Sequence, residues 1–138
     1  MRYYFMSLKE IDAQLLQYMV NYCNEIEITI NNFGKKESFF KNNFMYRNAL
    51  SMPIFQIGEL ANHLSEEFLK ENTQLPWTQI IGMRTRFAYG HQVMDNEAIW
   101  DTAIHDIPQL NQSCKQILRD NKYKIPTKKI FKPPNKER

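Results

Sequence analysis

The amino-acid sequence predicts an all-α fold, an antiparallel four-helix bundle followed by a basic, extended tail. Apolar residues recur at the three- and four-residue steps of helices along most of the chain, and only four glycines occur in 138 residues. Apolar residues make up 43% and charged residues 24%, as is usual for a globular protein. A chain of this length can bury the core of one domain without disulfides or metal ions.

The first helix is expected from about Ser7 to about Asn32. Ser7 and Glu10 have the spacing of a capping box, and Gly34 follows the helix as a stop. The predicted apolar stripe of this helix comprises Ile11, Leu15, Tyr18, Tyr22, Ile26 and Ile30.

A second long helix is expected from Phe39 to about Lys70. It could break near Asn42 and Asn43, and Pro53 should kink it unless a break falls there instead. Its predicted apolar positions are Phe44, Leu50, Ile54, Ile57, Ala61, Leu64 and Phe68.

The third helix is predicted within the stretch 75–91, which reads LPWTQIIGMRTRFAYGH. Pro76 suits the first helical position, and Gly90 suits the C-terminal stop. The apolar face should contain Ile80, Ile81, Met83 and Phe87. Arg84 and Arg86 then fall in the last turns, and His91 lies just beyond them.

A fourth helix should begin after Asp95 as its N-cap and continue through Leu118, with a bend at Pro108. Trp77 and Trp100 are interpreted as core or interface aromatics rather than platforms on which bases stack.

Positive charge is concentrated in residues 119–138, and we place the boundary between the bundle (1–118) and the tail (119–138) where this basic stretch begins. Residues 119–138 contain eight Lys or Arg against two acidic residues, a net charge of +6, whereas residues 1–118 carry −3. The tail also contains three prolines, so we expect it to be extended or disordered. It either solubilises the protein or binds RNA phosphates or an acidic partner.

Cys23 and Cys114 fall in predicted helices without metal-ligand spacing, which favours buried free thiols in a reducing compartment. His63, His91 and His105 are too scattered to predict a metal site, and no cofactor is expected. The sequence shows neither a secretory signal nor an apolar stretch long enough to cross a membrane, so we expect a cytoplasmic protein.

The stretch 75–91 carries the residues best suited to chemistry. A neutral histidine can take a proton from a ribose 2′-hydroxyl or give one to a leaving 5′-oxygen. An arginine can contact two phosphate oxygens as charge develops on them. The composition therefore suggests metal-free phosphodiester cleavage, although salt bridging or simple solvation of the arginines explains the same pattern.

Three blocks of sequence resemble one known family. They read IGELA at 57–61, LPWTQIIGMRTRFAYGH at 75–91 and AIWDTAIHDIPQL at 98–110. In this order they resemble the HepT-like branch of the HEPN (higher eukaryotes and prokaryotes nucleotide-binding) superfamily. The resemblance implies a homodimer of four-helix bundles and, in many members, a toxin ribonuclease. It also implies a partner, a minimal nucleotidyltransferase antitoxin that silences the toxin by adenylylating a tyrosine.

The family motif is altered in this chain. The resemblance implies an Arg followed by four residues, a His, one residue and a Tyr, usually with Asn after the Arg. Aligned on Arg84, the chain has Thr85 at the Asn position, Tyr89 at the His position and His91 at the Tyr position. Arg86 and His91 still have the Arg-x4-His spacing, and the Arg84–His91 spacing fits the looser pattern of the superfamily.

The predicted function is therefore that of a metal-independent endoribonuclease that cleaves single-stranded RNA with Arg84 and His91 in a cleft between two protomers. Glu59 is expected to orient Arg84, or else to serve as a polar anchor between helices. Arg86 and Tyr89 are supporting residues, and Tyr89 is the candidate for modification. The alternative is a catalytically degenerate dimer that binds a nucleotidyltransferase or a nucleotide.

Overall fold

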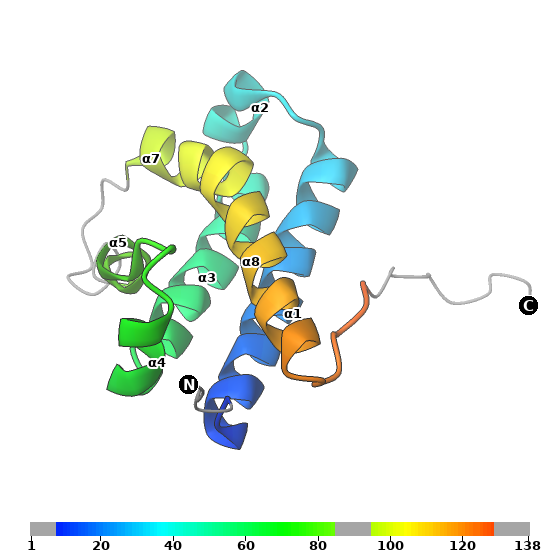
Figure 1. Cartoon of the computed structure of the whole chain (residues 1–138). Coiled ribbons are helices and arrows are strands. Elements are labelled where there is room, and N and C mark those ends of the chain that lie inside the picture. Colours follow the sequence, from blue (N-terminus) through cyan, green and yellow to red (C-terminus); the bar gives the residue numbers. More distant parts are fainter. Residues whose placement is uncertain (1–7, 85–94, 129–138) are drawn as a thin grey trace, which may run out of the picture.

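The computed structural model describes residues 8–84 and 95–128, which are helical with no strand in these ranges (Figure 1). Three long helices form the body of the molecule: α1 (Glu10–Phe33), α3 (Phe44–Ala61) and α8 (Ile107–Asp120). Helix α1 packs against both α3 and α8, and these two run in the opposite direction to α1. The predicted helical class and bundle packing are therefore confirmed.

Shorter elements connect the long helices. They are α2 (Glu37–Asn42), α4 (Glu66–Glu71), α5 (Trp77–Gly82), α7 (Asn96–Asp101) and a π-helical turn, η1 (Thr102–Asp106). Asp95 caps α7 by accepting a hydrogen bond from the Ala98 N–H, as predicted. The run from α7 through η1 to α8 changes direction between α7 and α8 (Figure 1), and Pro108 lies in the first turn of α8.

An aromatic cluster closes the end of the bundle where α1 turns into α2. The Phe33 and Tyr46 rings stack at 4.6 Å, and Phe40 and Trp100 contact Tyr46 edge-on. The Tyr46 hydroxyl donates a hydrogen bond of 2.8 Å to the carbonyl of Gly34, which ends α1 with a positive φ of 99°. Gly34 therefore ends α1, as predicted. Trp100 is buried in the core, which confirms its predicted role as a core aromatic.

The buried face of α1 differs from the predicted stripe. Ile11 and Tyr18 are 59% and 56% exposed, and only Ile26 of that stripe is fully buried. The buried face instead contains Ala13, Leu16, Met19, Val20, Cys23 and Ile26 together with the polar side chains of Asp12 and Asn24. The predicted capping box is also wrong, because α1 begins at Glu10 with Lys9 as its N-cap and no side chain caps it.

The predicted second helix is divided into three. Asn43 separates α2 from α3 and caps α3 by accepting from the Tyr46 N–H, so the expected break is confirmed. A second break, not predicted, ends α3 at Ala61, and Ser65 then caps α4. Pro53 lies buried inside α3, so the chain does not break there.

Residues 121–128, called the strap below, leave α8 and lie along α1 (Figure 1). The Gln17 amide donates to the Lys124 carbonyl at 2.9 Å, and Lys128 pairs with Glu27 at 3.0 Å. The strap begins with a turn at residues 121–122, and residues 123–128 have no regular secondary structure. The expected extended conformation of the tail stays a prediction.

Cys23 and Cys114 are buried free thiols, as predicted. Among the helices that the structure describes, none has the length and apolarity needed to cross a membrane.

Candidate functional site

Helix α5 brings Arg84 to the bundle by packing on α3. Its buried side chains are Trp77, Ile80 and, in the turn that follows, Met83. The Trp77 indole N–H also donates to the Asn72 carbonyl at 2.7 Å, which fixes the start of the helix. The predicted apolar face of this segment is confirmed at Ile80 and Met83, and the predicted core role of Trp77 is confirmed as well.

The segment after α5 is a turn. Helix α5 ends at Gly82, and the backbone N–H groups of Met83 and Arg84 donate to the carbonyls of Ile80 and Ile81. The expected continuation of the helix to Gly90 falls outside the described residues. Three candidate site residues, Arg86, Tyr89 and His91, lie in that same part of the chain, so their roles stay predictions.

Gly58 allows the Arg84 turn to approach α3 closely. A Cβ atom on Gly58 would lie 2.8 Å from the Arg84 backbone nitrogen and 3.1 Å from the Ile80 carbonyl oxygen. Real Cβ atoms essentially never approach backbone this closely, so a residue larger than glycine would displace the turn. Gly58 therefore positions Arg84, a role that the sequence analysis missed although Gly58 lies within the IGELA block.

The Arg84 side chain is partly buried, and its Nε is buried without a hydrogen-bond partner in the described part of the chain. Glu59 is also partly buried, one residue from Gly58, yet it forms no ion pair with Arg84 among the ion pairs of residues 8–84 and 95–128. The orienting role of Glu59 stays a prediction. A partly buried guanidinium with an unused donor is suited to bind an anion.

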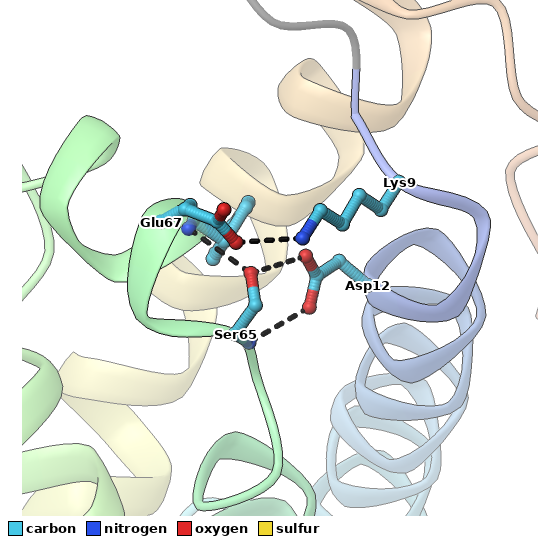
Figure 2. Close-up of polar contacts among 5 residues, drawn as sticks. Lys9, Asp12, Ser65 and Glu67 are labelled. Carbon is cyan, nitrogen blue, oxygen red and sulfur yellow. Dashed lines mark hydrogen bonds and ion pairs between the residues drawn. The ribbon is translucent and has the colours of Figure 1, made fainter.

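A polar junction fixes α4, and so the loop that leads into α5, to the first turn of α1 (Figure 2). The buried Asp12 carboxylate accepts hydrogen bonds from the Ser65 backbone N–H at 2.9 Å and hydroxyl at 2.7 Å. Above it, the Lys9 ammonium donates to Glu67 at 2.6 Å, and this bond lowers the pKa of the Glu67 carboxyl. The packing of Phe68 on Trp77, at 5.6 Å, then connects α4 to α5.

The other histidines do not contribute to this region. His63 and His105 are exposed on separate elements. Within residues 8–84 and 95–128, no group of His, Cys, Asp and Glu could hold a metal ion.

These features define an all-helical bundle that presents an arginine on a turn after a short helix. Residues 19–117 match the family model described as "Ribonuclease HepT-like", and the chain belongs to this family. The match includes the whole stretch 75–91 and ends before the strap.

Several relatives carry ribonuclease names. A protein of Caldanaerobacter subterraneus named "Putative RNase" is 31% identical over 86 residues, which cover 62% of this chain and 76% of the relative. A "Putative RNase" of Methanocaldococcus jannaschii is 24% identical over 110 residues, 80% of this chain and 98% of the relative. A "Probable ribonuclease HepT" of Thermococcus cleftensis is 25% identical over 61 residues, 44% of this chain and 56% of the relative. No solved structure gives a significant match.

Proposed function

We propose that the protein is a metal-independent endoribonuclease of a HepT-like toxin–antitoxin pair and that Arg84 and His91 perform the cleavage. The observation that carries the proposal is the placement of Arg84 in a chain of this family. Gly58 holds the Arg84 backbone against α3, and the Arg84 Nε has no hydrogen-bond partner among residues 8–84 and 95–128. An arginine guanidinium can bind a phosphate oxygen of RNA.

The proposed chemistry is an in-line transfer within the RNA. The 2′-oxygen attacks the adjacent phosphorus while its proton passes to a base, and the P–O bond to the 5′-oxygen breaks as that oxygen receives a proton. His91 exchanges protons in this reaction because imidazole titrates near neutral pH. Arg84 stabilises the charge that develops on the non-bridging phosphate oxygens. Single-stranded RNA is the proposed substrate, because unstacked nucleotides can adopt the in-line geometry.

We further propose a homodimer, in which the cleft between protomers contains both copies of the Arg84–His91 pair. Exposed apolar side chains on the described surface are compatible with self-association. They are Ile11, Tyr18, Phe39, Phe44, Met45 and Met52.

The test is cleavage of a single-stranded RNA in the presence of EDTA. The wild-type protein should cleave it, and Arg84→Ala and His91→Ala should each lower the rate about 100-fold or more, as loss of a transition-state donor or proton-transfer group does. Lys70→Ala removes an exposed cation on α4, outside the basic tail, and serves as the control that should retain full activity. Equal cleavage by wild type and His91→Ala would refute the assigned role.

The interchange of Tyr89 and His91 relative to the family motif favours one alternative, a dimer that has lost catalysis and binds a nucleotidyltransferase or a nucleotide. In this alternative Tyr89 is the candidate acceptor of a nucleotide. Co-expression and co-purification with a minimal nucleotidyltransferase, followed by intact-mass measurement, tests it. A bound partner or a mass increase of one AMP, without RNA cleavage by the free protein, would support the alternative over the nuclease.

A further inference from the structure

A pocket of about 410 Å³ lies between the second half of α1, η1 and the start of α8. Its volume falls within the range of small-molecule sites, which is roughly 300–1,000 Å³. The apolar part of its lining includes Ile26 and Ile30 of α1 with Ala103, Ile104 and Ile107 of the opposite wall. This apolar surface can accommodate a compact apolar or aromatic group.

Three lysines from separate elements line the same pocket. Lys35 follows α1, Lys115 lies on α8, and Lys128 lies at the end of the strap. Only Lys128 is paired, with Glu27, among the ion pairs of the described residues. Glu27 also lines the pocket, so the lining contains three lysines and one acidic side chain. The lining therefore has a net positive charge that the chain leaves uncompensated.

The backbone of the wall is unusual as well. The five residues of η1 form a π-helical turn, and Ala103 and Ile104 of this turn line the pocket. Insertions of this kind in helices occur frequently at functional sites.

From these three observations we infer that the pocket between α1, η1 and α8 binds a small organic anion, a carboxylate or phosphate on a compact apolar body. The apolar side chains enclose the body, and Lys35 and Lys115 bind the anionic group. None of these residues belongs to the Arg84 site. Binding can therefore be measured independently of ribonuclease activity.

Indole-3-acetate is a suitable probe, because it combines an aromatic body and a carboxylate. Isothermal titration calorimetry of the full-length protein should show one site per chain. 3-Methylindole, which lacks the charge, should bind at least about tenfold more weakly. 1-Naphthyl phosphate compared with 1-naphthaleneacetate tells whether the pocket prefers a phosphate or a carboxylate.

The variants Lys35→Met and Lys115→Met combined should weaken binding of indole-3-acetate by about tenfold or more, and Ile104→Trp should abolish it by filling the pocket. Lys70→Met, an exposed lysine on α4, is the matched control and should bind as wild type does. Thermal unfolding establishes that each variant is folded. No binding by the wild-type protein, or equal binding by wild type and the double lysine variant, would overturn the inference.

Discussion

At the scale of single residues, burial decides how the two thiols behave. Burial raises the pKa of Cys23 well above its usual value and raises the pKa of Cys114 to about 12. Their free state could be predicted from the sequence because no metal-ligand spacing surrounds them. Their burial was also expected from their positions in predicted helices, but the packing of α1 against α8, where they lie, could not be predicted.

The raised pKa values predict a loss of stability at high pH. Between about pH 9 and pH 11 the thiols ionise in the unfolded chain, near pKa 8.5, but stay protonated in the folded protein. The unfolded state then binds fewer protons, so the free energy of unfolding falls by up to about 1.4 kcal/mol per pH unit for each thiol. Urea unfolding at several pH values measures this slope, which should be smaller in Cys114→Ala than in wild type. Identical slopes would contradict the assigned burial.

The buried carboxylate of Asp12 should be the most sensitive polar residue of the junction between α1 and α4. Asp12→Ala removes both acceptors of Ser65, and hydrogen bonds to charged groups contribute about 1.5–3 kcal/mol each. We expect the free energy of unfolding to fall by about 3 kcal/mol in chemical denaturation. Gln14→Ala, at an exposed position of the same helix, should change it by less than about 0.5 kcal/mol. A loss as small as that of the control would show that the junction does not stabilise the fold.

At the scale of elements, the helical spacing of apolar residues predicted where helices form better than it predicted which face of each helix is buried. Helix α1 contains two overlapping stripes with helical spacing, one through Ile11 and Tyr18 and another through Leu16, Met19 and Val20. The second stripe is the buried one, and Asp12 and Asn24 on that side accept hydrogen bonds from Ser65 and Asn111. No local pattern reveals those partners. The breaks at Asn43 and Asp95 were predictable because both residues cap the following helix themselves.

The contact between α3 and the Arg84 turn depends on one glycine. Gly58→Ala introduces a Cβ only 2.8 Å from the Arg84 nitrogen, so the turn must move. We expect a loss of about 1–3 kcal/mol in unfolding free energy, as for other overpacked sites. RNA cleavage should fall as well, because Arg84 is displaced. Gly82→Ala is the matched control, since a Cβ there meets nothing within 4 Å among residues 8–84 and 95–128. Equal stability and activity of the two variants would contradict the positioning role of Gly58.

At the scale of the whole molecule, residues far apart in the sequence form the sites. Arg84 was predictable because it stands in a dense local motif, whereas its contact with Gly58 requires the packing of α5 on α3. The pocket lysines, Lys35, Lys115 and Lys128, are separated by long stretches of chain, so no sequence pattern joins them. The strap was predicted to be extended, but its attachment to α1 through Gln17 and Glu27 was not.

The chemical nature of the cleaved ends tests the proposed ribonuclease most directly. Attack by the 2′-oxygen leaves a 2′,3′-cyclic phosphate on one fragment and a 5′-hydroxyl on the other, without a metal ion. Mass spectrometry of a single-stranded RNA oligonucleotide incubated with wild-type protein and EDTA should show these ends, and neither Arg84→Ala nor His91→Ala should produce them at a comparable rate. Fragments with 5′-phosphate ends, or cleavage of an oligonucleotide that lacks the 2′-hydroxyl at the cleaved position, would contradict the Arg84–His91 mechanism.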